Sequence, residues 1–347
     1  MFRGSKTLEI YGRGDHQNVA AILFDMKVRV IPVLAVLCVL VAFSSAQEPA
    51  IRVDEHLVAV PTAVLDRNGR YITNLSKRDF TVRENDLEQE IVFFQTVESP
   101  FTALLLLDLS GSMNDHIPEL AQSVEAFVDQ LRNEDQLIVA GFVDDSNIRI
   151  LQEPIRKKDF RKRIHLGMTS GDSYTTTFDA VAKSMRYMNR IEGRKAIVLF
   201  TDGELFGRGA SAKSTLREAQ EQEAAFYTIR FGEYPTHQPG LRMEGSQFPY
   251  ERRIGDGELK KLKSRVTAYL EGLSYASGGR SFDIDKVGSL EKTFRNVAAE
   301  LGQQYLIVYS PAMSPKEGER RRITVNVSVK DVAVRARREV VFRSPRK

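Results

Sequence analysis

One short stretch limits what this chain can fold into more than any other: an apolar run that ends in oxygen-bearing side chains. Residues 102–107 read Thr-Ala-Leu-Leu-Leu-Leu, without a charge or a proline. Such a run is typical of a strand that is buried on both faces of a parallel sheet. It leads directly into Asp108, Ser110 and Ser112. Because open α/β folds bind ligands at the carboxyl ends of their strands, we expect a ligand site here.

The chemistry of this D-x-S-x-S segment favours a hard divalent cation. One carboxylate and two hydroxyls at alternate positions of a tight loop can converge on a single point, and oxygen ligands suit Mg²⁺, Mn²⁺ or Ca²⁺. Taken alone, a segment of this kind is more often a surface turn in which the side chains bond to the nearby backbone. The metal interpretation therefore depends on further motifs.

Two later segments supply those motifs. Residues 175–179 read Thr-Thr-Thr-Phe-Asp at the start of an expected helix, and a second apolar strand, residues 195–201, ends next to Asp202. With these segments the sequence resembles the von Willebrand factor type A (VWA) family and its metal-ion-dependent adhesion site (MIDAS). The resemblance implies a doubly wound, mostly parallel α/β sheet of the Rossmann-like type, with helices on both faces.

Carried over position by position, the resemblance implies a set of metal ligands that all offer oxygen: Asp108, Ser110, Ser112, Thr175 and Asp202. Mg²⁺ is the expected cation, with Mn²⁺ and Ca²⁺ as alternatives. The chain departs from the family pattern at Ser173 and Tyr174, where two glycines usually precede the threonine. We expect Asp179 to brace the helix after the threonine rather than to bind the metal.

The resemblance extends over nearly the whole chain after the amino-terminal signal. It includes Leu-Ser-Tyr-Ala-Ser-Gly-Gly-Arg-Ser-Phe at residues 273–282 and Ala-Glu-Leu-Gly-Gln-Gln-Tyr-Leu-Ile-Val-Tyr at residues 299–309. In this layout the sequence is similar to the VWFA-related family of exported bacterial proteins that is named for acidobacteria. That family has no agreed molecular function, so the resemblance defines the architecture more closely than the role.

The amino-terminal segment predicts export. Residues 26–46 combine a short basic start, an apolar run and a final Ser-Ser-Ala, which is the pattern of a signal peptide cleaved after Ala46. The apolar run is short and contains Pro32, so we expect no stable membrane span after cleavage. Residues 1–25 are expected to be a misassigned start, or a lead before a signal that is kept as an anchor. The predicted location is secreted or periplasmic.

Composition excludes several kinds of site. The single cysteine, Cys38, lies inside the signal, so the mature chain would hold neither a disulfide nor a thiolate metal site. Residues 1–46 carry five Lys and Arg against three Asp and Glu, and removing this +2 from the formal +4 leaves +2. A chain this close to charge balance does not favour nucleic acid as a partner.

The order of the predicted elements indicates three parts after the signal. Residues 51–100 are β-rich, residues 101–304 alternate strands and helices as a VWA domain would, and residues 305–343 return to strands. Each β-rich segment has too few strands to bury a face alone, so we expect the two to pair in one small β-sandwich. The Pro/Gly-rich residues 233–256 are expected to be an insertion loop.

The predicted ligand set separates the function classes. Three of its five oxygens come from neutral hydroxyls, so the cation keeps much of its charge and an open position for an acidic side chain of a protein partner. Hydrolytic sites instead gather carboxylates or histidines around a base, and the five histidines of this chain are scattered. We therefore expect an exported, non-enzymatic binding or adhesion module with an extracytoplasmic protein ligand. The alternatives are a structural subunit of a cell-envelope assembly and, less favoured, a metal-dependent hydrolase.

The partner is expected to bind at the rim of the metal site. The residues that follow or flank the predicted ligands are those of 113–116, 174–176 and 204–209. These three segments form the predicted contact surface.

Overall fold

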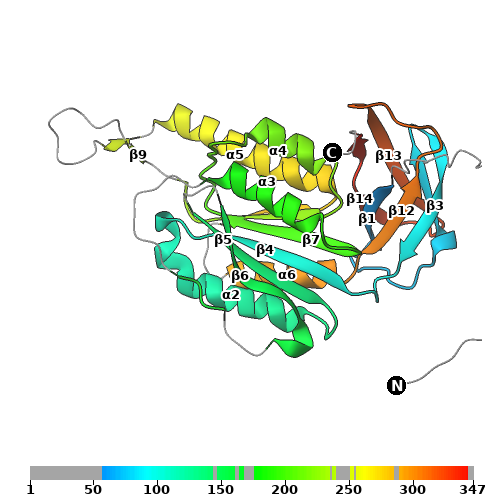
Figure 1. The fold of residues 1–347 in the computed structure, drawn as a ribbon, viewed down its shortest axis with the longest axis horizontal. Helices are drawn as coiled ribbons and strands as arrows, with labels where there is room; N and C mark the ends of the chain where they lie inside the picture. Colours follow the sequence, from blue (N-terminus) through cyan, green and yellow to red (C-terminus); the bar gives the residue numbers. More distant parts are fainter. Residues whose placement is uncertain are drawn as a thin grey trace, which may run out of the picture. The chain divides into compact units, whose positions relative to one another are not determined.

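The computed structural model describes residues 57–143, 147–160, 164–167, 176–234, 237–239, 251–253, 255–284 and 289–342. They lie in one compact unit and form a helix-covered sheet and a second, antiparallel sheet (Figure 1). The expected signal and the residues before it fall outside the described part. In the described part, no helix combines the length and the apolar character that crossing a membrane requires.

The first sheet has six strands, in the order β11 (Arg280–Ile284), β8 (Ala225–Phe231), β7 (Arg194–Thr201), β4 (Phe101–Asp108), β5 (Gln136–Phe142) and β6 (Ile148–Arg156). All neighbours are parallel except β5 and β6. The central strand β4 is the predicted apolar run, and every one of its residues is buried. The predicted mostly parallel α/β sheet is confirmed.

Helices cover both faces of this sheet (Figure 1). Leu105 and Leu107 of β4 belong to the core with α2 (Ile117–Gln130) and α6 (Leu290–Leu301). Leu104 and Leu106 point to the other face, whose core includes α3 (Thr177–Met188), α4 (Ala212–Ala219) and α5 (Asp256–Ser277). Alternate residues of one strand thus enter two cores, which explains why β4 is apolar throughout.

Strand β6 is an element that the sequence did not predict. Its apolar and polar residues do not alternate regularly, it contains Pro154, and none of its residues is buried. Because β6 is an edge strand paired only with β5, its proline interrupts no sheet interior. The predicted insertion loop contains a second unexpected pairing, the short antiparallel strands β9 (His237–Pro239) and β10 (Glu251–Arg253).

The second sheet has seven strands, and its order is β14 (Ala333–Ala336), β1 (Val58–Leu65), β12 (Tyr305–Ser310), β3 (Leu87–Gln95), β2 (Phe80–Glu84), β13 (Arg320–Val327) and β15 (Glu339–Val341). Strand β12 lies between β1 and β3, so the expected pairing of the two β-rich segments is confirmed. Strands β14 and β15 lie at opposite edges, yet only Arg337 and Arg338 separate them in the chain. The sheet must therefore curl, and it encloses one core.

Buried arginines link the β-rich segments to the α/β domain. Arg337 donates to the carbonyl oxygens of Ala59 and Gln222, each at 3.2 Å, and Arg194 donates to that of Val97 at 2.9 Å.

Short 3-10 turns complete the fold: η1 (Lys77–Asp79), η2 (Gly111–His116) and η3 (Lys157–Asp159).

Candidate metal centre

The register of the parallel sheet brings the two acidic motifs together. Leu107 of β4 pairs with Phe200 of β7, so the next residues along, Asp108 and Thr201, stand side by side at the carboxyl edge. The Thr201 hydroxyl donates to Asp108 Oδ2 at 2.9 Å. Asp202 follows directly, and its Oδ1 accepts the backbone N–H of Glu204 at 3.0 Å. The carboxyl edge thus holds both acids of the predicted ligand set.

The two serines connect these acids. The loop after β4 turns back so that Ser110 N–H donates to Asp108 Oδ1 at 3.1 Å. The hydroxyl oxygens of Ser110 and Ser112 are 3.0 Å apart, and Ser112 Oγ donates to Asp202 Oδ2 at 2.5 Å. Four of the predicted ligands, from motifs about ninety positions apart, therefore converge. The fifth, Thr175, lies outside the described residues, as do Ser173 and Tyr174.

The donor set fits a small divalent cation. In octahedral coordination at the usual Mg²⁺–oxygen distance, neighbouring oxygens are about 2.9 Å apart, which matches the 3.0 Å between the two serine hydroxyls. All the converging side chains offer oxygen, and only two are carboxylates. Nowhere in the described ranges do three His, Cys, Asp or Glu side chains gather in a way that could hold a metal. The site is therefore rich in hydroxyls and low in charge.

Burial divides the site into a closed back and an open front. Asp108 is 0% exposed and Ser110 is 2% exposed, whereas Ser112 is exposed and Asp202 is partly exposed. Burial, and next the charge of nearby Asp202, raise the pKa of Asp108 to about 8, although hydrogen bonds from Ser110 and Thr201 oppose this rise. A buried carboxylate beside a second one favours a bound cation or a proton.

Thr201 is a site residue that sequence reasoning missed. Besides its bond to Asp108, its hydroxyl oxygen accepts the N–H of Gly203 at 3.1 Å, so it fixes both the buried carboxylate and the turn that carries Asp202. Its position as the last residue of β7, next to an acid, was the available signal. Because Thr201 ends the strand beside Asp108, its hydroxyl is placed to donate to the second carboxylate oxygen of Asp108.

Asp179 was expected to brace the helix that it belongs to, but its carboxylate holds the loop after Asp202 instead. Its Oδ2 accepts the N–H of Arg208 at 2.7 Å, and its Oδ1 accepts those of Gly209 and Ala210 at 3.0 and 2.9 Å. Both oxygens are thus in use, and the carboxylate is nearly buried. Next to it, Thr177 Oγ1 donates to the Glu204 carbonyl oxygen at 2.5 Å.

The predicted rim is only partly at the surface. Met113 is 1% exposed and Thr176 is 0% exposed, so including them was wrong: Met113 enters the α2 side of the core, and both the N–H and the hydroxyl of Thr176 bond to the Val143 carbonyl oxygen. His116 packs edge-on against Phe231, with ring centroids 4.9 Å apart. Residues of the 204–209 segment are exposed and remain as rim.

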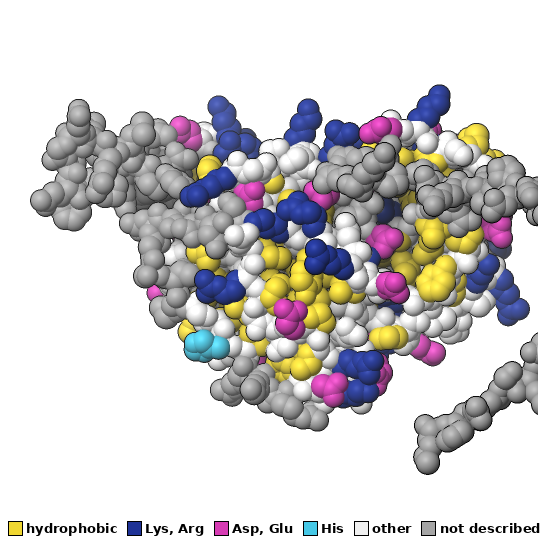
Figure 2. All heavy atoms as spheres, viewed as in Figure 1, with side chains coloured by type: hydrophobic (Ala, Val, Ile, Leu, Met, Phe, Trp, Pro, Cys, Tyr) yellow, Lys and Arg dark blue, Asp and Glu magenta, His cyan; other side chains and the backbone are white. Residues whose placement is uncertain are grey.

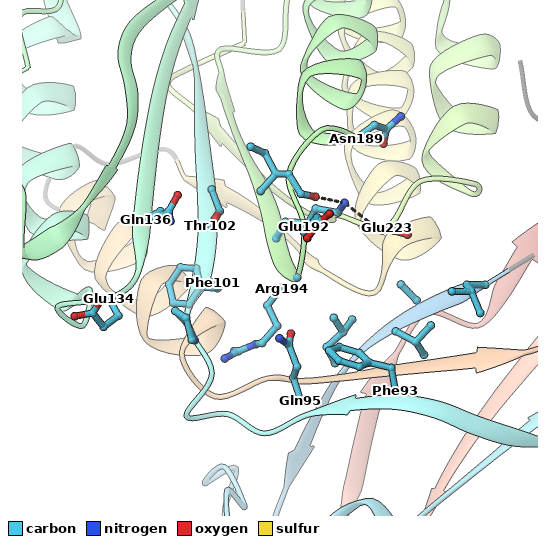
Figure 3. A pocket seen from close by; sticks show the side chains of 18 residues that line it. Phe93, Gln95, Phe101, Thr102, Glu134, Gln136, Asn189, Glu192, Arg194 and Glu223 are labelled. Carbon is cyan, nitrogen blue, oxygen red and sulfur yellow. Dashed lines mark hydrogen bonds and ion pairs between the residues drawn. The ribbon is translucent and has the colours of Figure 1, made fainter. Parts of the chain in front are cut away.

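A pocket of about 740 Å³ lies at the opposite, amino-terminal edge of the sheet (Figure 3). Phe101 and Arg194, the first residues of β4 and β7, line it together with Phe93 of the second sheet. Lys195 and Glu223 also line it, and they form an ion pair at 2.6 Å. Since Asp108 ends the strand that Phe101 begins, this pocket is not part of the candidate metal centre.

Comparison with known proteins identifies the family of the central region. Residues 104–247 match the von Willebrand factor type A domain. A solved von Willebrand factor type A protein from Catenulispora acidiphila is 12% identical, with 76% of this chain and 74% of that one covered and a TM-score of 0.43. The ArnB paralog VWA2 from Sulfolobus acidocaldarius is 13% identical, with coverages of 84% and 76% and a TM-score of 0.40.

A third similar structure is proximal thread matrix protein 1 from the mussel byssus, which has a zinc-occupied MIDAS motif. It is 15% identical, with 63% of this chain and 49% of that one covered and a TM-score of 0.43. Among curated proteins, none matches this chain. The match at residues 104–247 begins in β4 and includes Asp108, both serines and Asp202. The chain therefore contains a von Willebrand factor type A domain, and its candidate metal centre lies within that domain.

Proposed function

We propose that this protein is an exported binding module that engages a protein ligand through a divalent cation. The residues that would hold the cation are Asp108, Ser110, Ser112, Thr175 and Asp202. The observation that carries the proposal is the convergence of Ser110, Ser112 and Asp202 through oxygen–oxygen contacts of 2.5–3.0 Å. Asp108 joins this group through the N–H of Ser110, which donates to its Oδ1 at 3.1 Å. Type A domains generally bind a divalent cation at this motif and act as binding modules rather than as enzymes.

The charge of the site supports a carboxylate ligand. A bound divalent cation would supply an electrophilic coordination position for one oxygen of the partner. Two carboxylates balance the charge of the divalent cation, and the hydroxyls of Ser110 and Ser112 add no negative charge that would repel a further acid. An incoming acid is therefore attracted, and because Asp108 forms the buried back of the site, it would approach from the side of Ser112 and Asp202.

The direct test measures cation binding and partner binding separately. Calorimetric titration with Mg²⁺ should give binding for the wild type and none for Asp108→Asn. Immobilised protein should then capture a partner from an envelope extract in Mg²⁺ and release it in EDTA. Wild-type capture that persists in EDTA would favour the structural-subunit alternative. A hydrolytic activity that Asp108→Asn abolishes without loss of capture would favour the hydrolase.

A further inference from the structure

We propose that Phe206 and Arg208 form a second contact for the partner, and that the partner is a protein segment of the acid–apolar–acid type. One acid would bind the cation, the apolar residue would pack on Phe206, and the second acid would pair with Arg208. This inference rests on the proposed function and names the class of ligand that the site selects. It follows from the construction, the exposed chemistry and the charge surroundings of the loop at residues 203–210.

This loop is held by several hydrogen bonds to the start of α3. Asp179 accepts three of its successive N–H groups, Thr177 donates to its Glu204 carbonyl oxygen, and Phe178 N–H donates to its Phe206 carbonyl oxygen at 2.9 Å. All three anchoring residues belong to the first turn of α3. The loop is therefore fixed to the element that follows the predicted ligand Thr175.

Two glycines make the close fit possible. A Cβ atom on Gly207 would lie against the Ala210 carbonyl oxygen and 2.9 Å from Phe178 Cβ, and a Cβ atom on Gly209 would lie 3.1 Å from Asp179 Oδ1. Larger residues would push the loop off α3. A binding surface that is already rigid loses little conformational entropy when a partner binds, so such a loop is suited to hold contact residues in place.

The side chains that this rigid loop presents are those of an interface. Phe206 is 42% exposed, and the other exposed large apolar residue described in the α/β domain, Tyr275, lies near the far end of α5. Arg208 is exposed, and within the described ranges no carboxylate pairs with its guanidinium. Aromatic residues and arginines dominate the energetic centres of protein interfaces, and here they alternate along one loop beside Asp202.

The charge surroundings favour an acidic partner on this side. Helices α4 and α5 together carry six Lys and Arg against four Asp and Glu, and Figure 2 shows Lys and Arg side chains along their surface. Helix α2, on the other face of the sheet, carries three acids and no cation. The first half of α5 lies close to the site, because a Cβ atom on Gly203 would be 2.9 Å from Val266. An acidic segment is thus attracted along the α4–α5 side.

The test uses labelled peptides with the core Asp-Leu-Glu, measured by fluorescence anisotropy in Mg²⁺. Wild type should prefer this peptide over its Asn-Leu-Gln and Asp-Gly-Glu versions. Phe206→Ala should weaken binding about tenfold, as for a central interface residue. Arg208→Ala should weaken it about threefold to fivefold, as for an exposed ion pair. The matched controls Phe93→Ala and Arg186→Ala, which remove an exposed ring and an exposed guanidinium elsewhere, should bind as wild type does.

Two further peptides, Asn-Leu-Glu and Asp-Leu-Gln, each replace one of the two acids by its amide. Measuring both peptides with the wild type and with Arg208→Ala shows which acid makes which contact. Replacing one acid should mimic EDTA, and replacing the other should make Arg208→Ala indistinguishable from wild type. Calorimetry should show unchanged Mg²⁺ affinity in the Phe206 and Arg208 variants, and a loss of affinity would instead assign the loop a metal-positioning role and overturn the inference.

The failures of the two proposals are distinguishable. If EDTA and Asp108→Asn abolish peptide binding while Phe206→Ala and Arg208→Ala leave it intact, the second contact is wrong and the metal-dependent function stands. If EDTA has no effect on binding, the proposed function itself fails. If Arg186→Ala is as damaging as Arg208→Ala, or if wild type does not prefer the Asp-Leu-Glu peptide, the specific contact is refuted.

Discussion

Substituting Asp108 by Asn should stabilise the metal-free protein at alkaline pH, although it removes a predicted metal ligand from the centre of the site. Asp108 is fully buried, its Oδ1 accepts Ser110 N–H and its Oδ2 accepts the Thr201 hydroxyl. An asparagine has the same shape, keeps the first bond and reverses the second, since its amide can donate to Thr201 Oγ1. The substitution therefore leaves no cavity and removes the charge that burial and Asp202 oppose.

The pH dependence follows from the direction of the pKa shift. Burial and then Asp202 raise the pKa of Asp108 from 3.8 to about 8. Between these values the folded protein keeps a proton that the unfolded chain has lost, so the stability of the metal-free protein falls as pH rises from about 4 to about 8. At about 1.4 kcal/mol per pKa unit, the upper limit for this rise is about 6 kcal/mol. Local relaxation reduces the cost of a buried charge, so we expect the metal-free protein to lose about 2 kcal/mol of unfolding free energy over this range.

Magnesium should reverse this order. A ligand present at a hundred times its dissociation constant stabilises the folded state by about 2.7 kcal/mol, and Asp108→Asn should gain almost nothing. Urea unfolding followed by circular dichroism, between pH 4 and 9 in EDTA or in MgCl₂ at constant ionic strength, measures both effects. The control Asp129→Asn changes an exposed carboxylate and should not alter the pH slope. Wild-type stability that rises with pH in EDTA, or a variant less stable than wild type at pH 8, would refute the reasoning.

Three further outcomes are expected. Thr201→Val leaves one carboxylate oxygen of Asp108 and the N–H of Gly203 without their hydroxyl partner. It should therefore cost about 1–3 kcal/mol of unfolding free energy and weaken Mg²⁺ binding. A Mg²⁺ affinity equal to that of the wild type in calorimetry would contradict this role. Gly279→Ala places a Cβ atom on the Phe226 carbonyl oxygen, so it should lower the unfolding free energy by about 3 kcal/mol or more. As the control, Gly257→Ala meets open space in α5 and should be neutral or stabilising in the same denaturation assay. Mass spectrometry of the exported protein should find a mature start after Ala46, and intact residues before that point would show that the signal is not cleaved.

The sequence predicted those parts of the fold that depend on local pattern. A strand that is apolar at every position, such as β4, has to lie at the centre of a sheet with two cores, and its carboxyl end then locates Asp108. Strand β6 escaped because an edge strand needs no apolar pattern and tolerates Pro154. The β-rich segments were expected to pair, but their closure into one curled sheet depends on the step through Arg337 and Arg338, which no periodicity reveals.

The candidate site shows the same division between local and long-range information. Asp108, Ser110 and Ser112 lie on one loop, so their convergence is a local property of the spacing. The role of Thr201 depends on the register between two strands that are far apart in the sequence. That register also explains why Ser112 reaches Asp202. Because Thr201, the last residue of β7, lies beside Asp108, the residue that follows β7 lies next to the serine loop. The geometry of the centre is therefore fixed by the sheet before any cation binds, and the cation would find most of its ligands already placed.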